Sequence, residues 1–184
     1  MASYSTHEEL EAGLSTVRQS PRNGGLVKMI VRRPQVDARE VLDACPLDRV
    51  EGLMGDSWKT RGGIPNPEKQ LTIMNSRVID LIAKHEERWP LAGDQLFIDL
   101  DLSSANLPPG TQISIGNAAV EISAQPHKGC KKFLARFGPD ALKFVNSEMG
   151  LRLNLRGINA KVIQSGVVRV GDSVTKKAQP TTSE

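Results

Sequence analysis

Along much of its second half, this 184-residue chain alternates apolar and polar residues. A period of two is the spacing of a β-strand, whose successive side chains point to opposite faces of a sheet. The alternation covers residues 98–102, 113–115 and 120–122, and turn-forming sequences at residues 108–110 and 116–117 separate the runs. Each run is therefore predicted to be a short strand that leads through a tight turn to the next one.

Further strands and a few helices complete the predicted fold. Strands are expected at residues 26–31 and 71–74, and as a pair within residues 159–174. Helices are expected as a short segment capped by Asp37, over residues 77–87 behind a Ser76 cap, and over residues 131–137 and 139–149. Because short strands outnumber helices, we predict a β-rich α+β domain, an antiparallel β-barrel-like fold with a few peripheral helices.

The composition indicates one globular domain. Hydrophobic residues make up 39% of the chain and charged residues 24%, which is enough apolar material for a core. The polar sequence at each end predicts a flexible N-terminal segment over residues 1–20 and a disordered tail over residues 176–184. Residues 21–175 are then the domain itself.

Charge and hydropathy exclude several classes of function. A net charge of +3 and an aromatic content of 4% argue against nucleic-acid binding. No apolar run is long enough to span a membrane, and no export leader is evident, so we expect a cytoplasmic location without membrane contact. The two cysteines, Cys45 and Cys130, lie far apart and are expected to be free thiols in a reducing compartment.

Residues 125–132 (QPHKGCKK) hold the strongest candidate for chemistry. Cys130 follows a turn and is predicted to enter the first turn of a helix, where free backbone N–H groups carry partial positive charge. Nearby lysines and Arg136 add charge. Both effects favour the thiolate, which is the nucleophilic and metal-binding form of cysteine. His127 is a candidate proton partner or orienting group.

The residues alone leave a second interpretation open. A lone cysteine is often a small buried hydrophobic residue, and Cys130 could have that role. Cys45 lies on the apolar side of the helix predicted after Asp37, and for it packing is the expected role. The basic residues around Cys130 either bind phosphate or another anion, or form a solvated surface.

Four sequence features, in a fixed order and spacing, point to a known family. They are Gly25-Leu26-Val27 leading to Arg33-Pro34; Gly52-Leu53-Met54-Gly55-Asp56 followed by Arg61-Gly62-Gly63; Ala92-Gly93-Asp94-Gln95-Leu96; and Cys130 after a strand and a proline, followed by residues 166–172 (GVVRVGD). In these features the chain resembles the MOSC domain family, named after the C-terminal domain of molybdenum cofactor sulfurases, over nearly all of residues 20–175.

The resemblance implies a β-barrel-like fold and a role for Cys130 as persulfide carrier or molybdenum ligand. It also implies a molybdenum cofactor, with basic residues at the pterin phosphate, and a separate pyridoxal phosphate-dependent cysteine desulfurase as sulfur donor. The candidates for the pocket wall are Asp56, Arg61, Gly62, His127, Lys128 and Arg156. The chain departs from the family at Arg61, where many members have histidine, and at residues 127–129, where the approach to the cysteine differs.

Three functions therefore remain open. The first is a cysteine-based sulfur carrier or sulfurtransferase-like protein, or a molybdenum cofactor-binding protein. The second is a small molybdenum-dependent reductase of N-hydroxylated compounds. The third is a non-catalytic module that binds an anion or cofactor, with Cys130 in a structural role.

Overall fold

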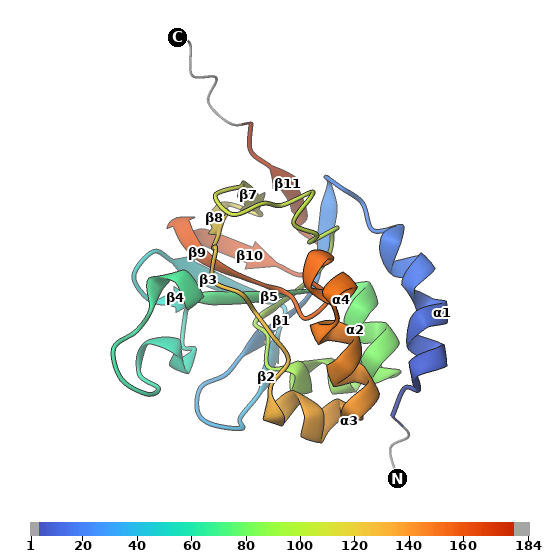
Figure 1. Cartoon of the computed structure of the whole chain (residues 1–184). Coiled ribbons are helices and arrows are strands. Elements are labelled where there is room, and N and C mark those ends of the chain that lie inside the picture. Colours follow the sequence, from blue (N-terminus) through green and yellow to red (C-terminus); the bar gives the residue numbers. More distant parts are fainter. Residues whose placement is uncertain (1–3, 179–184) are drawn as a thin grey trace.

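The computed structural model describes residues 4–178, and its largest feature is a closed β-barrel (Figure 1). In chain order the barrel strands are β1 (Gly25–Arg32), β5 (Leu71–Asn75), β6 (Leu96–Asp99), β7 (Gln112–Ile115), β8 (Ala118–Ile122), β9 (Ile158–Gln164) and β11 (Ser173–Lys176). They are arranged in the order β11-β7-β8-β9-β5-β6-β1, and a pairing of β1 with β11 closes the ring. Neighbours are antiparallel except β5 and β6, which run parallel.

Four further strands lie outside the barrel. Strand β2 (Glu40–Leu42) adds to β1, with Ile30 opposite Leu42. Strands β3 (Ala44–Asp48), β4 (Gly52–Leu53) and β10 (Gly166–Arg169) form a separate small sheet in the order β10-β3-β4. The predicted β-rich fold with a barrel is confirmed, with a mixed rather than purely antiparallel barrel.

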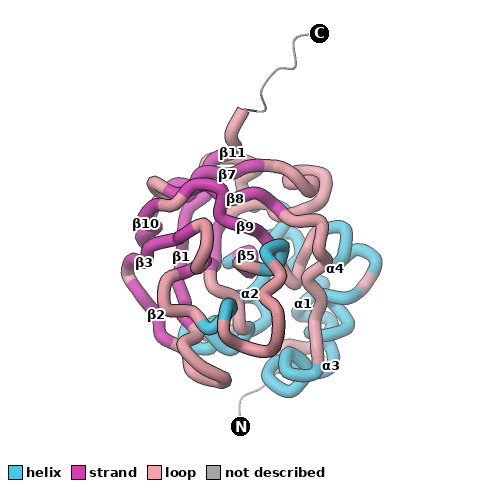
Figure 2. Tube along the Cα trace, turned by 90° about the vertical axis from the view of Figure 1, so that its left-hand side faces the viewer, coloured by secondary structure: helices cyan, strands magenta, loops and turns pink. Residues whose placement is uncertain are grey.

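The α-helices lie together on one side of the barrel, as Figures 1 and 2 both show. They are α1 (His7–Arg18), α2 (Ser76–Ala83), α3 (Lys131–Asn146) and α4 (Glu148–Arg152). Three short 3-10 helices lie in the connections: η1 (Ser57–Lys59), η2 (Pro67–Lys69) and η3 (Glu86–Ala92). The end of η3, the segment that follows it and the start of α3 contribute to the candidate site.

Two hydrophobic clusters hold barrel and helices together. The first gathers apolar side chains from all seven barrel strands, including Leu96 and Ile98 of β6. The second includes Phe97 of the same strand together with Phe133 and Phe137 of α3. Because alternate side chains of a strand point to opposite faces, β6 contributes to both clusters and is buried on both sides.

The N-terminal segment departs from the sequence prediction. Residues 7–18 form helix α1, whereas the sequence predicts a flexible segment over residues 1–20. A capping box between Thr6 and Glu9 begins the helix, and the apolar stripe that includes Leu10 and Leu14 is buried in the second cluster. The domain therefore begins before residue 21, and Met1–Ser3 lie outside the described residues.

The helix predicted after Asp37 is wrong, because this segment forms β2 and β3 instead. Asp37 has a positive φ of 61°, which places it in a turn and not at a helix cap. Pairing with β1 and β10 decides the outcome: tertiary hydrogen bonds override the local capping pattern.

The predicted helix boundaries also shift. Helix α2 is capped by Asn75 rather than Ser76, because the Asn75 side chain accepts from two backbone N–H groups. It ends at Ala83, and Lys84 has a left-handed backbone with φ 65°. The predicted break at Gly138 is confirmed, with φ 86° inside α3, and the following helical segment ends at Asn146. At the other end, Lys176 belongs to β11, and residues 179–184 of the predicted tail lie outside the described part of the chain.

Candidate functional site

Cys130 is exposed and stands at the N-terminal boundary of α3. Its backbone is extended (φ −124°, ψ −179°), and its carbonyl accepts the hydrogen bond of Leu134 N–H. The thiol itself does not cap the helix. Backbone N–H groups at a helix N-terminus carry partial positive charge, so the thiol lies where a negative charge is favoured.

The segment that leads into Cys130 is anchored at two points. His127 Nε2 lies 2.9 Å from Asp94 Oδ1. Gly129 N–H donates to Asn146 Oδ1 at 2.9 Å, and Asn146 Nδ2 donates to the Gly129 carbonyl at 3.1 Å. Contacts from outside the segment therefore fix the path of the chain up to the cysteine.

Asp94 is the centre of a buried ionic network. Its side chain is fully buried, and Arg156 Nη1 lies 2.6 Å from its Oδ2. The guanidinium of Arg156 also stacks over the ring of Phe133 in α3, 4.9 Å from the ring centroid. Charges in an apolar interior are tolerated when they are paired and hydrogen-bonded, so this network links the segment between η3 and β6 to residue 156 and α3.

The network holds Asp94 ionised and His127 neutral. Burial alone would raise the pKa of Asp94, but the charge of Arg156 and the hydrogen bonds from His127 and Arg156 lower it below its ordinary value. Burial lowers the pKa of His127, and the nearby Arg156 adds to that shift, although Asp94 opposes it. Because Asp94 is an acceptor, we infer that His127 Nε2 carries the hydrogen of their bond.

Four arginines donate to four successive carbonyls at the end of η3. The carbonyls of Pro90, Leu91, Ala92 and Gly93 accept from Arg39, Arg136, Arg156 and Arg33, respectively, at 3.1, 2.8, 2.9 and 2.7 Å. The last carbonyls of a helix lack partners within it and carry partial negative charge. Residues 90–93 therefore bind positive side chains from three segments: the loop between β1 and β2, helix α3, and the segment before β9.

Arg33, Arg39, Arg61 and Arg136 form what we call the arginine cluster. Burial lowers the pKa of Arg39, and the charges of Arg136 and Arg33 lower it further. Arg61 is an exposed residue whose guanidinium is partly shielded from solvent by its neighbours, and this desolvation, followed by the charge of Arg33, lowers its pKa. Positive charge is thus crowded here beyond what the neighbouring carboxylates neutralise, which favours binding of an anion.

Asp37 connects the arginine cluster to the first turns of α3. Its Oδ1 lies 3.0 Å from Arg136 Nη2 and 3.6 Å from Lys132 Nζ. Lys132 is two residues from Cys130, and Arg136 is six residues away, which is about 9 Å along a helix. The cluster and the thiol therefore share one region of the surface.

Asp56 has a supporting position under the cluster. It forms a bidentate ion pair with Arg33, with both N···O distances at 2.8 Å, and it accepts from Trp58 N–H. Both side chains of the pair are nearly inaccessible to solvent. Asp56 therefore holds Arg33 in place and begins η1.

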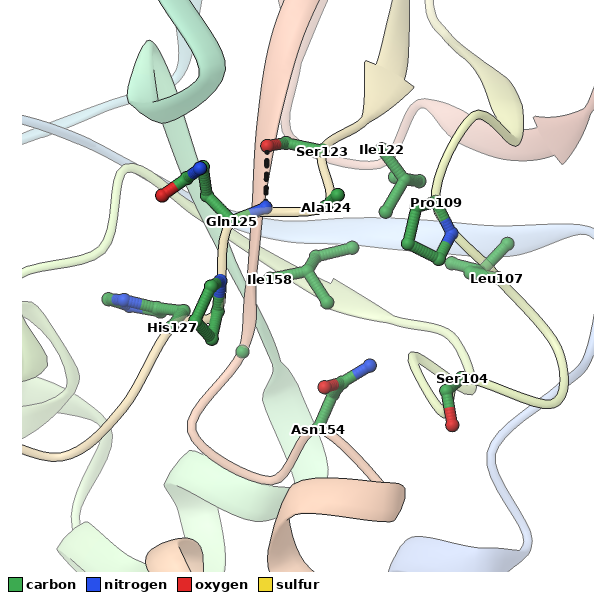
Figure 3. A pocket seen from close by; sticks show the side chains of 12 residues that line it. Ser104, Leu107, Pro109, Ile122, Ser123, Ala124, Gln125, His127, Asn154 and Ile158 are labelled. Carbon is green, nitrogen blue, oxygen red and sulfur yellow. Dashed lines mark hydrogen bonds between the residues drawn. The ribbon is translucent and has the colours of Figure 1, made fainter. Parts of the chain in front are cut away.

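Residues 123–127 also form part of the wall of a cavity of about 180 Å³ (Figure 3). Its lining includes Leu107, Ile158 and Asn154. Figure 3 shows the His127 imidazole pointing away from Asn154 and Ile158, and Gln125 N–H donates to Ser123 Oγ at 3.0 Å. His127 is thus among the residues that line this cavity, while its imidazole is bonded to Asp94.

The candidate site residues fall into two groups. Arg61, Gly62, Lys128 and Cys130 are exposed around the arginine cluster and the start of α3, whereas Asp56, His127 and Arg156 lie beneath it in ion pairs and hydrogen bonds. Sequence reasoning did not identify Arg33, Arg39, Asp94 or Asn146 as site residues. Arg33 and Asp94 had a local signal, since they stand in the first and third of the four sequence features, whereas Arg39 and Asn146 had none.

Cys45 is buried in the barrel cluster, as expected for a packing residue. Burial raises the pKa of its thiol. Within residues 4–178, no group of three or more His, Cys, Asp or Glu side chains could hold a metal ion. No helix in that same range is both long and apolar enough to cross a membrane.

Comparisons with known proteins agree with this fold. A crystal structure of a hypothetical protein is 20% identical, with a TM-score of 0.58, and covers 91% of this chain and 72% of its own. The YuaD protein of Bacillus subtilis is 17% identical over 84% of this chain and 97% of its own, with a TM-score of 0.58. YiiM of Escherichia coli is 18% identical over 84% of this chain and 70% of its own, with a TM-score of 0.55. At these identities the likeness supports the fold alone.

A search of curated protein sequences returned no match. The family model of the MOSC domain matches residues 60–175, which is more than half of the chain. The match includes Arg61-Gly62-Gly63, the Gly93-Asp94 element and Cys130. Strand β1, which precedes the matched range, closes the same barrel. The chain belongs to the MOSC domain family.

Proposed function

We propose that Cys130 is the reactive centre of this domain and that a molybdenum cofactor binds beside it. The observation that carries this proposal is the exposed thiol at the start of α3, within two helical turns of the arginine cluster. A soft thiolate is a suitable ligand for a transition metal of this kind.

The residues present fit such a cofactor. Arg61 is exposed at the arginine cluster, and Lys128 and Lys131 are exposed on either side of Cys130. These three side chains would hold the phosphate of a pterin, because cations and helix N-termini favour phosphate. The cofactor, when bound, supplies a redox-active metal, which suits the reduction of small N-hydroxylated compounds.

The buried residues beneath the thiol hold the side chains and backbone of the site in place. Asp56 holds Arg33, and Asp94 holds Arg156 and His127. Because His127 is neutral and bonded to Asp94, it orients the segment before Cys130 and does not add a cation to it. A ligand site keeps a precise geometry when hydrogen bonds and ion pairs hold the residues that surround it.

A sulfur carrier is the second candidate, and the exposure of Cys130 favours it. In this role the Cys130 thiolate attacks the outer sulfur of a persulfide on a pyridoxal phosphate-dependent desulfurase. A new S–S bond forms on Cys130, the donor S–S bond breaks, and the donor cysteine leaves as its thiolate. An exposed acceptor thiol is needed because the donor is a second protein.

The test is to produce the protein in a host that makes molybdenum cofactor, and to measure molybdenum and pterin fluorescence after purification. The proposal predicts both in the wild type and clearly less of each in Arg61→Ala, because one phosphate-binding cation is removed. A matched control, Arg152→Ala, removes an exposed arginine of α4 and should leave the content unchanged. Equal content in all three proteins would count against cofactor binding at the arginine cluster. Persulfide uptake without molybdenum would favour the sulfur carrier.

A further inference from the structure

Helix α3 folds back on itself, and this brings Asn146 to the residue before the cysteine. A straight helix over Lys131–Asn146 would separate its ends by about 24 Å. Instead, the Asn146 side chain bonds to Gly129 at 2.9 and 3.1 Å. The reversal occurs at Gly138, where φ is 86° and ψ is 173°, and Pro139 follows it. The last turn of α3 therefore lies beside its own N-terminus.

The contact at Gly129 leaves no room for a side chain. A Cβ added there would lie 2.7 Å from Leu142 Cδ1 and 3.0 Å from Val145 Cγ2. Both neighbours belong to the same last turns that carry Asn146. Glycine at position 129 therefore allows the backbone to lie close to the last turns of α3.

The hydrogen bonds to Gly129 are complementary and use both of its backbone groups. Asn146 supplies one acceptor to the N–H and one donor to the carbonyl, which fixes the orientation of its amide. Cys130 follows directly, and its own side chain makes no capping bond. The amide of Asn146 is therefore a side-chain contact that fixes the backbone directly before the residue that carries the thiol.

We propose that Asn146 is a positioning residue for Cys130. It touches no ligand. It sets the direction in which the chain enters α3, and so holds the thiol at the positive end of the helix. The proposal rests on the proposed function of Cys130 as the reactive centre, but it concerns the reactivity of the thiol itself and has its own readout.

The experiment compares alkylation rates of Cys130 by iodoacetamide at pH 7.5, followed by mass spectrometry of the Cys130 peptide. The buried Cys45 in the same protein serves as an internal measure of unfolding. In Asn146→Ala the rate at Cys130 should fall about threefold or more, because Gly129 loses both hydrogen bonds and the exposed thiol is no longer held in one position at the start of α3. Asn146→Asp keeps the volume, loses the donor to the Gly129 carbonyl and should also lower the rate.

The matched control is Asn106→Ala. Asn106 is buried and donates to the carbonyls of Arg22 and Asp101 at 3.0 and 2.7 Å, so its loss also removes an amide bonded to backbone. This variant should lose stability without a change in the rate at Cys130. An unchanged rate in both Asn146 variants, or an equal fall in Asn106→Ala, would overturn the proposal. If wild-type protein takes up neither molybdenum nor sulfur while the Asn146 effect persists, the proposed function fails and the positioning role stands.

Discussion

Asp94 and Arg156 form a buried ion pair in which Arg156 Nη1 lies 2.6 Å from Asp94 Oδ2, with His127 on the other carboxylate oxygen. The Asp94 side chain is wholly inaccessible, and only 6% of that of Arg156 is exposed. A buried charge that loses its partner is left uncompensated in an apolar medium. Stability of the whole domain therefore depends on this pair being complete.

Replacement of Arg156 by leucine should destabilise the protein by about 3–5 kcal/mol, because Asp94 then lacks its cation. Urea unfolding followed by circular dichroism would measure the change. Lys84→Ala removes an exposed pair with Glu9 and should change the free energy of unfolding little. Similar losses in both variants would argue against a special role for the buried network.

The same network predicts a pH dependence of stability. The pKa of His127 is lowered by burial and by Arg156, so the folded protein resists a proton that the unfolded chain accepts below about 6.5. The stability that this group contributes is present above that value and is lost as pH falls toward the folded-state pKa. The pKa of Asp94 is also lowered, and its share is lost only below its ordinary 3.8.

The urea concentration at the unfolding midpoint of the wild type should therefore decrease when the pH is lowered from 7.5 to 5. His127→Gln keeps a donor for Asp94 but does not titrate, so its midpoint should change less over this range. His85→Gln, at an exposed position, should retain the wild-type slope. If the urea midpoint changes equally with pH in the wild type and in His127→Gln, the pH dependence comes from a group other than His127.

The reversal of α3 at Gly138 makes a second stability prediction. Alanine at a left-handed position costs about 1–2 kcal/mol from backbone strain alone. At Gly138 an added Cβ would also lie 2.6 Å from the ring of Tyr4. Gly110 has nearly the same φ, 87° against 86°, but open space around it. Gly138→Ala should therefore lower the free energy of unfolding more than Gly110→Ala, and equal costs would show that the Tyr4 contact relaxes freely.

The barrel was predictable because its signals are local. The turn at residues 116–117 joins β7 and β8 as predicted, and the strand expected over residues 98–102 is present but covers Leu96–Asp99. The segment after Asp37 was not predictable in this way. Its capping pattern is genuine, but pairing of Glu40–Leu42 with β1 depends on residues that the local sequence does not contain.

The site was only partly predictable for the same reason. The basic turn around Cys130 is visible because its charges are neighbours in sequence. Arg33 and Arg39 reach the site only because the carbonyls of residues 90–93 gather them. Asn146 lies 17 positions from Gly129, and only the fold-back at Gly138 brings the two together.

The two cysteines should differ sharply in reactivity. Burial raises the pKa of the Cys45 thiol and removes it from solvent, whereas Cys130 is exposed. We expect Cys130 to be alkylated at least about tenfold faster than Cys45 in the folded protein, and the two rates to converge in urea. Faster reaction at Cys45 in the folded state would contradict the described burial.

The most direct test of the central claim is the molybdenum content of wild-type and Cys130→Ser protein, both purified from a host that makes molybdenum cofactor. Serine keeps the size of the side chain and removes the soft ligand. The account predicts molybdenum with pterin in the wild type and a clear loss of molybdenum in Cys130→Ser, with the urea midpoint unchanged. Equal molybdenum content in both proteins would contradict the role of Cys130 as the metal ligand.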